Sequence, residues 1–310
     1  MGKHKVVKIL FFCLYLIACK DNKDFVDMAK KISYSSASGI EYLNNQLYII
    51  GDDANYILIL DKELLSIDSI LLQDKAENRI PKTIKPDLEC ISVTPEGKLL
   101  LMGSGSKPPF RDIAWLTDTV PGKMDSIKLD TFYSRLRENG FPLLNIEGLC
   151  HTPNGIIISN RGNQSIPENH LLFLENNFWQ NQSSCSYNAI PVIIQNDNKS
   201  FGGVSGLYYS SISDKLILSV STEDTQSNTE DGEIGKSYLC IINNASILKN
   251  RKAIIPDRVI DLEAIDSRFY KQKIESVCIM EETKNNFLLT LVADNDNGSS
   301  TLFKVLIHKD

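Results

Sequence analysis

A short pattern repeats five times along the 310-residue chain, and it limits the possible folds more than any other feature. Each copy has an apolar residue, a Ser or Glu, a small residue and an apolar residue, then a turn, an apolar run and a polar cluster. The Ser or Glu positions are Ser38, Glu89, Glu147, Ser205 and Glu275, which lie 51, 58, 58 and 70 residues apart. Several short strands per unit at this spacing are typical of a β-propeller.

The clearest copy, Ile146–Asn163, has the pattern of a β-hairpin. Ile146–Thr152 and Ile156–Asn160 are expected to be strands, with a Pro-Asn-Gly turn between them. Each unit has room for two more strands, except the fifth, which has only Ser300–Ile307 after its hairpin. The sequence therefore predicts an all-β protein, a propeller of five four-stranded blades, with Ile32–Ser35 as the strand that closes the ring.

Two other features bear on the predicted architecture. The 70-residue step is long enough to hide a sixth blade around Ile254–Ile265, which is the alternative blade count. Long amphipathic helices are scarce, and the best helical candidate is Thr131–Glu138.

The N-terminus has the pattern of a targeting segment. Three lysines precede the apolar run Ile9–Ala18, which is too short to span a bilayer as a mature helix. The run ends in Leu-Ile-Ala-Cys, which resembles the lipobox of bacterial lipoproteins. That resemblance implies a signal peptide over residues 1–18, lipid on Cys19 and membrane attachment through it, followed by a charged tether over 19–31 and the propeller domain over 32–310.

The tether begins with Lys and acidic residues, which resemble surface-export signals of Bacteroidetes lipoproteins. We therefore expect an exported protein anchored to the outer membrane, with surface exposure as an extension of that idea. A simple secretory signal that is cut nearby is the alternative.

Charge and cysteine usage exclude some classes of protein. The formal net charge is −6, so the chain has no basic face for nucleic acid. We also expect the protein to be a monomer. Five cysteines remain after Cys13 and Cys19 are set aside, an odd number without close spacing. We therefore expect no disulfide framework and no thiolate metal site.

The repeat also places polar side chains. The first strand of a hairpin begins where the second strand ends, so the repeated polar positions should meet at one mouth of the central channel. We expect this ligand-binding funnel to contain one positive residue, Arg161, together with Ser38, Asp52, Asp53, Asp87, Glu89, Ser205, Glu223 and Glu275. The alternative is that each Glu only accepts hydrogen bonds from the neighbouring blade.

Carboxylates this close together raise one another's pKa unless a cation neutralises them. Ca²⁺ is bound by carboxylate and carbonyl oxygens, so it would suit such a site. The predicted metal ligands are Glu89, Glu147, Glu275, Asp294 and Asp296.

The openings Ser-Gly-Ile, Asp-Leu-Glu and Ile-Glu-Gly-Leu are followed by Asp-Asp, Ser-Gly-Ser and Asn-Arg-Gly-Asn clusters. This combination resembles bacterial phytase-like propeller proteins, including those with esterase-like phytase domains, over Ser33–Ile307. An uncharacterised exported subset of that group is the most similar. The resemblance implies a Ca²⁺-assisted funnel that hydrolyses phosphoesters, with Glu89, Glu147, Arg161 and Glu275 as the matching residues. The chain departs from the phytases in lacking a basic cluster for a polyphosphorylated inositol.

Two hypotheses for function follow. In the first, the funnel binds a cation and a small ligand and hydrolyses a phosphoester or ester, with Glu147 and Arg161 as catalytic residues. There the metal would polarise substrate and water, and Arg161 would stabilise the negative charge that develops. In the second, the propeller is a non-catalytic cell-surface module that binds a glycan or a protein. Propellers serve both roles, so the fold does not decide between them.

Overall fold

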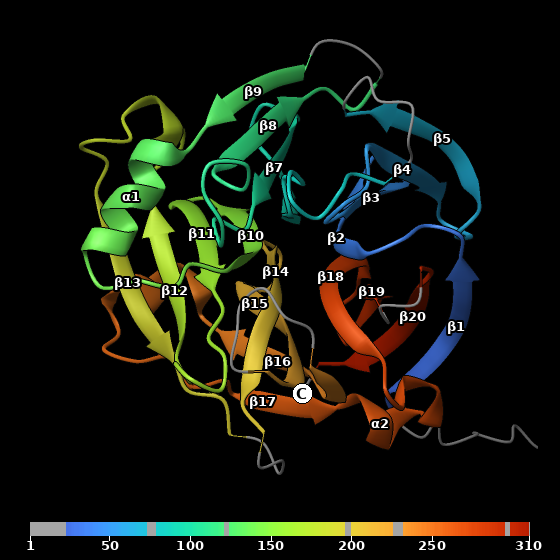
Figure 1. Ribbon diagram of the computed structural model, residues 1–310. Coiled ribbons are helices and arrows are strands. Elements are labelled where there is room, and N and C mark those ends of the chain that lie inside the picture. Colours follow the sequence, from blue (N-terminus) through green and yellow to red (C-terminus); the bar gives the residue numbers. More distant parts are fainter. Residues whose placement is uncertain are drawn as a thin grey trace, which may run out of the picture.

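The computed structural model describes residues 23–72, 79–120, 124–195, 200–225, 232–294 and 298–309. Five four-stranded antiparallel sheets surround a central channel, which confirms the five-bladed propeller (Figure 1). Each of the first four blades is built from consecutive strands, in order from the channel outward.

The strands of these four blades are as follows. Blade 1 comprises β2 (Ala37–Leu43), β3 (Gln46–Gly51), β4 (Tyr56–Asp61) and β5 (Ser66–Leu71). Blade 2 comprises β6 (Leu88–Val93), β7 (Leu99–Gly103), β8 (Ile113–Thr117) and β9 (Met124–Lys128). Blade 3 comprises β10 (Ile146–Thr152), β11 (Gly155–Asn160), β12 (Asn169–Leu174) and β13 (Tyr187–Val192). Blade 4 comprises β14 (Gly202–Ser210), β15 (Lys215–Asp224), β16 (Glu233–Asn243) and β17 (Arg258–Asp261).

Blade 5 closes the ring by combining both ends of the chain. It comprises β18 (Lys273–Glu282), β19 (Asn286–Asp294), β20 (Ser300–His308) and, as its outer strand, β1 (Phe25–Ile32). β1 pairs antiparallel with β20, so the outer edge of β20 is covered.

The closing strand is N-terminal, as predicted, but it begins seven residues before the predicted Ile32–Ser35 and overlaps that range only at Ile32. The rest of the predicted segment leads into the turn before β2, where Ser36 has a φ of 52°. Residues 25–31 therefore belong to the propeller and not to a tether. Residues 1–18, the expected signal peptide, and Cys19 lie outside the described residues.

The described residues of the long step before blade 5 form no sixth blade. Within Ile254–Ile265, β17 is the outer strand of blade 4, and the helix α2 (Leu262–Ile265) follows it. Three short 3₁₀ segments are η1 (Phe178–Gln180), η2 (Ala245–Asn250) and η3 (Ser267–Phe269).

The predicted short helix is α1 (Asp130–Glu138). It buries Phe132, Tyr133 and Leu136 in the apolar cluster between blades 2 and 3. None of the helices in the described part of the chain has the length and hydropathy needed to cross a membrane.

The core consists of five apolar clusters, one between each pair of neighbouring blades. In β3, Leu47 and Ile49 face blade 5, whereas Tyr48 and Ile50 face blade 2. A strand packed on both faces needs a continuous apolar run, which explains why the second strand of each repeat has one. Cys90, Cys150, Cys185, Cys240 and Cys278 are buried and free.

A β-bulge lies at the same place in the inner strand of every blade. The pairing register shifts across the Ser or Glu of each repeat, for example between Ile146 and Gly148. A bulge changes the direction of the side chain at the extra residue. The small residue that follows lets the blades approach closely, because a Cβ on Gly148 would lie 2.5 Å from Leu207 Cγ.

Candidate functional site

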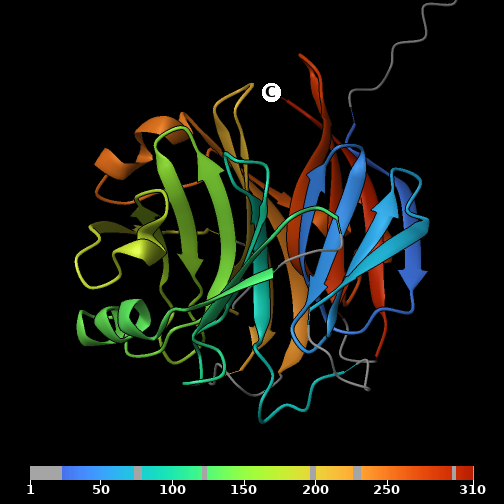
Figure 2. The same cartoon turned by 90° about the horizontal axis from the view of Figure 1, so that it is seen from above.

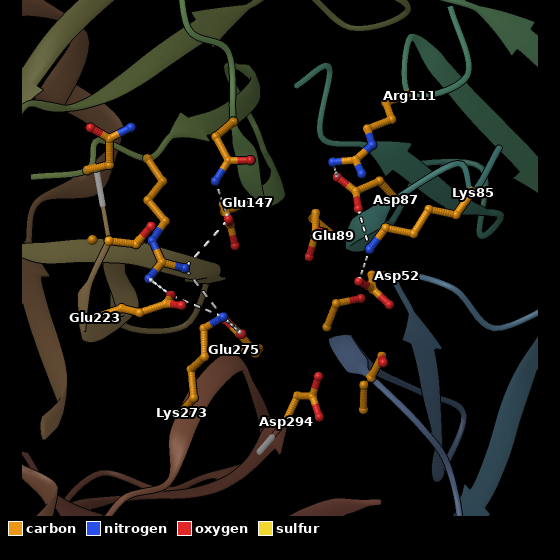
Figure 3. A pocket seen from close by; sticks show the side chains of 18 of the residues that line it. Asp52, Lys85, Asp87, Glu89, Arg111, Glu147, Glu223, Lys273, Glu275 and Asp294 are labelled. Atoms are coloured by element: carbon orange, nitrogen blue, oxygen red, sulfur yellow. Dashed lines mark hydrogen bonds and ion pairs between the residues drawn. The ribbon is translucent and has the colours of Figure 1, made fainter. Parts of the chain in front are cut away.

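The bulges converge at one end of the channel, where they form a charged funnel (Figure 3). Its volume is about 880 Å³, including the solvent at its open mouth. Carboxyl and cationic side chains from all five blades dominate the lining. The charged lining residues are Asp52, Lys82, Lys85, Asp87, Glu89, Arg111, Glu147, Arg161, Glu223, Lys273, Glu275 and Asp294.

The funnel brings together most of the residues singled out in the sequence. Those that line it are Ser38, Asp52, Asp87, Glu89, Glu147, Arg161, Glu223, Glu275 and Asp294. Asp53 lies outside the lining and is paired with Arg79, whose Nη2 is 2.6 Å from Asp53 Oδ2. Asp296 lies outside the described residues.

The serines of the repeat link neighbouring blades. Ser205 is fully buried behind the lining, and its hydroxyl donates a hydrogen bond to Ile274 O at 2.6 Å. Ser38 makes the matching bond to Leu88 O at 2.5 Å. Ser205 is therefore a structural residue, and the expectation that it lines the funnel was wrong.

The first charged cluster surrounds Lys85, between blades 1 and 2. Lys85 Nζ contacts Asp52 Oδ2 and lies 2.8 Å from Asp87 Oδ1. Asp87 also pairs with Arg111 Nη1 at 2.6 Å and accepts a hydrogen bond from the Ser104 hydroxyl at 2.5 Å. One lysine thus contacts carboxylates from two neighbouring blades.

The second cluster surrounds Arg161, between blades 3, 4 and 5. Arg161 Nη1 lies 3.5 Å from Glu147 and 3.8 Å from Glu275, and Nη2 lies 3.5 Å from Glu223. Lys273 Nζ lies 3.1 Å from Glu275 Oε1 and 3.2 Å from Glu223 Oε2. At these distances Arg161 makes loose ion pairs, and its one hydrogen bond among the described residues goes to the Ser221 hydroxyl, at 3.1 Å from Nη2.

Most of the cationic residues of the funnel were not predicted from the sequence. The expectation of a single positive residue in the funnel was wrong. Lys82, Lys85, Arg111 and Lys273 join Arg161 in the lining. A signal was present for Lys273, because it precedes Glu275 by two positions in an expected strand. Residues two apart in an extended chain point the same way.

Burial and crowding raise the pKa of two carboxyl groups of the funnel. Burial, followed by the charges of Asp87 and Glu147, raises the pKa of Glu89 well above its usual value. Burial raises the pKa of Glu147 to about 7, although Arg161 partly opposes that shift. Glu223 differs, because Lys273 and Arg161 outweigh the effect of burial and lower its pKa.

The donor set does not fit Ca²⁺. Among the described residues, the carboxylates that bring oxygens within 4.8 Å of one another are those of Asp52, Asp87 and Glu89. Ca²⁺ takes six to eight oxygen ligands, whereas here Lys85 already contacts two of the three carboxylates. The other expected ligands, Glu147, Glu275 and Asp294, do not join this group.

Comparison with solved structures shows similarity in fold. The glutaminyl cyclase of Myxococcus xanthus is 10% identical, with a TM-score of 0.54 over 93% of this chain and 97% of that one. A virginiamycin B lyase of Staphylococcus aureus is also 10% identical, with a TM-score of 0.42 over 90% and 99%. At this identity the likeness shows the fold alone.

Comparison with sequences gives a family without an assigned activity. No curated protein matches the chain. The resemblance to phytase-like propellers therefore stays a prediction. One family model matches residues 33–307, which is nearly the whole propeller, so the chain belongs to the family described as a family of unknown function (DUF6929).

Proposed function

We propose that the funnel is the active site of a hydrolase that uses general acid–base catalysis on a small polar ester. The observation that carries this proposal is the position of Glu89 and Glu147. They project from the neighbouring inner strands β6 and β10 into one open pocket, and Arg161 lies 3.5 Å from Glu147. An acid, a base and a guanidinium that can bind an oxyanion thus line the same space.

Each of the three groups has a role in the proposed reaction. Glu147, with a pKa of about 7, is partly ionised at neutral pH and takes a proton from the attacking water. The water oxygen bonds to the ester carbonyl, and Arg161 donates hydrogen bonds to the oxygen that becomes negative. Glu89, held protonated by its raised pKa, gives its proton to the leaving alkoxide as the ester C–O bond breaks. Exchange with solvent then returns both carboxyl groups to their starting states.

The charge of the funnel favours a carboxylic ester over a phosphoester. The described lining has seven carboxyl groups, Asp52, Asp87, Glu89, Glu147, Glu223, Glu275 and Asp294, against five cationic side chains. Four of the cations, Lys85, Arg111, Arg161 and Lys273, already face carboxylates. A doubly charged phosphate would have to compete with these carboxylates for the cations, whereas a neutral carboxylic ester would not.

Hydrolysis of p-nitrophenyl acetate and p-nitrophenyl phosphate by the purified protein tests the proposal. We expect turnover of the acetate, with kcat/KM lowered about 100-fold or more by Glu147→Gln and much less by Glu89→Gln, because p-nitrophenolate leaves without a proton. Glu96→Gln is the matched control, because Glu96 is exposed in the turn at the far end of the β6–β7 hairpin. Equal turnover by wild type and both funnel variants would reject the proposed roles. Ligand binding without turnover would favour the non-catalytic module.

We further propose that the protein is exported and anchored to the outer membrane through lipid on Cys19. The Leu-Ile-Ala-Cys sequence supports this, and the geometry of β1 makes it compatible with an open funnel. Phe25 pairs with Leu306 at the end of the molecule opposite the funnel, and Ile32 pairs with Ser300 near it. In Figure 2, the N-terminal end of β1 lies at the same end of the molecule as the C-terminus.

The funnel would therefore open away from the membrane. Six residues lead from Cys19 to Phe25, a reach of at most roughly 20 Å. Labelling cells with a fatty-acid analogue tests the anchor. We expect label on wild type and none on Cys19→Ser, together with release of that variant from the membrane fraction. Label on both proteins would reject Cys19 as the lipid site.

A further inference from the structure

We propose that the substrate of the funnel carries a protonated amine, which binds to the acidic wall formed by blades 5 and 1. This wall consists of Glu275 on β18, Asp294 at the end of β19 and Asp52 directly after β3. The inference rests on the proposed function, because it takes the funnel as the ligand site. It adds the chemical class of the group that is recognised.

Two buried oxygens of this wall need hydrogen-bond donors. Glu275 is 7% exposed, and its Oε2 accepts no hydrogen bond from the described residues. The nearest charged group that the structure describes for this oxygen is Arg161 Nη1, at 3.8 Å. Asp52 Oδ1 is also buried without a hydrogen bond from the described residues. Buried carboxylate oxygens are costly unless a donor reaches them.

The cations near the wall bind the opposite oxygens of the same carboxylates. Lys273 Nζ contacts Glu275 Oε1, and Lys85 Nζ contacts Asp52 Oδ2. Each carboxylate therefore has one oxygen held by a lysine and one oxygen that lacks a donor. A ligand that supplies N–H groups complements this pattern, whereas a ligand that supplies only acceptors does not.

A single positive charge suits the site better than a neutral donor or a divalent metal. With Glu89 protonated and Glu147 partly ionised, the other five carboxylates of the lining roughly balance its five cations, so the preference for a cation is local to the wall of Glu275, Asp294 and Asp52. A divalent ion would need six or more oxygens, and the two lysines already hold half of those on Glu275 and Asp52. The three wall carboxylates do not together form a group whose oxygens lie within 4.8 Å of one another. The ammonium therefore donates hydrogen bonds to one of them and is attracted by the charge of the others, while the rest of the ligand can extend toward Glu89 and Glu147. Figure 3 shows these two side chains projecting into the same pocket.

Calorimetric titration with three small primary amines, glycinamide, ethanolamine and glucosamine, tests the proposal. N-acetylglycinamide is the matched neutral compound, and inorganic phosphate and CaCl₂ are the competing chemistries. We expect glycinamide to bind at least about tenfold more tightly than its acetylated form, which corresponds to about 1.4 kcal/mol. Equal binding of the pair, or failure of all three amines to bind, would overturn the proposal. Tighter binding of phosphate or Ca²⁺ would also overturn it.

Substitution of the wall carboxylates tests where the amine binds. Glu275→Gln keeps the shape of the side chain and should weaken glycinamide binding about tenfold, and Asp52→Asn should do the same. The exposed Glu96→Gln should bind like wild type. Thermal melting of each variant checks its folding. If Glu275→Gln fails to fold, the affinity of Asp52→Asn for glycinamide tests the amine site. Unchanged affinity in a folded variant would exclude that carboxylate from the amine site.

Two ester substrates distinguish a failure of the amine proposal from a failure of the proposed hydrolase activity. Glycine ethyl ester and N-acetylglycine ethyl ester differ only in the amine, and their hydrolysis is followed by titration of the acid released. Equal turnover of both, abolished by Glu89→Gln, would reject the amine and keep the hydrolase. Binding of glycinamide without turnover of either ester would keep the amine and count against the hydrolase.

Discussion

The Arg161 side chain lies directly against Gly203, the second residue of β14. A Cβ on Gly203 would lie 2.3 Å from Arg161 Nε and 2.8 Å from its Cγ. The absence of a side chain at residue 203 therefore lets the arginine cross from blade 3 toward Glu223 on blade 4. Because an arginine side chain is flexible, an added methyl group should displace the guanidinium and leave the blade intact.

We expect Gly203→Ala to lower kcat/KM for the ester about 10- to 100-fold, with little change in melting temperature. Enzyme assays and thermal melting measure the two effects. A double-mutant cycle with Arg161→Ala provides the control, because both substitutions remove the same interaction and should not be additive. Full additivity would mean that Gly203 acts through something other than Arg161.

Lys85 occupies the position that a metal ion would take between Asp52 and Asp87. Replacing it by Met leaves buried carboxylates without their ammonium, which should cost about 3–5 kcal/mol of stability. Millimolar Ca²⁺ should then raise the melting temperature of Lys85→Met, because the oxygens of Asp52, Asp87 and Glu89 lie within 4.8 Å of one another. Thermal melting of both proteins with chelator and with added CaCl₂ measures this. A calcium-dependent shift in wild type would instead restore the calcium site expected from the sequence.

Glu41 on β2 gives stability a pH dependence. It is buried, and it accepts hydrogen bonds from Tyr42 N at 2.8 Å and Val93 N at 3.2 Å. Burial raises its pKa from 4.5 to about 7. Between these values the folded protein holds a proton that the unfolded chain has lost, so rising pH favours unfolding.

Glu41→Gln cannot lose a proton. The difference in stability between variant and wild type should shift in favour of the variant by up to about 3 kcal/mol between pH 4.5 and 8. Urea denaturation across that range measures it. Glu63→Gln, at an exposed position in blade 1, is the control and should follow wild type. A pH-independent difference for Glu41→Gln would show that its ionisation is not linked to folding.

Asp24 joins the two ends of the chain beside β1. Its carboxylate accepts a hydrogen bond from His308 N at 2.7 Å and pairs with Arg258 Nη2 at 2.6 Å. Asp24→Ala should therefore lower the free energy of unfolding by about 1–3 kcal/mol. Urea denaturation gives the value, and hydrogen exchange should show faster opening of β1. Asp27→Ala, at an exposed residue of the same strand, should change neither quantity.

The period of the repeat determined the fold. Each unit carries one bulge residue and one apolar run, and a strand such as β3 must bury both of its faces, so the units have to stack around a ring. The bounds of the closing strand could not be predicted from the sequence, because Phe25–Ile32 has a mixed burial pattern, typical of an outer strand. Which segment becomes this outer strand depends on pairing with the free edge of β20. That edge exists only once the ring has formed.

The sequence by itself determined that Glu89, Glu147, Arg161 and Glu275 would meet at one mouth, because hairpin geometry and the repeat fix where each lies along its strand. Only the tertiary structure decided which charges pair. Lys85 and Lys273 each contact carboxylates on two different strands, and those distances depend on how neighbouring blades are packed. The same packing decides which carboxylate oxygens are left without a donor, because hydrogen bonds depend on tenths of an ångström that no local pattern encodes.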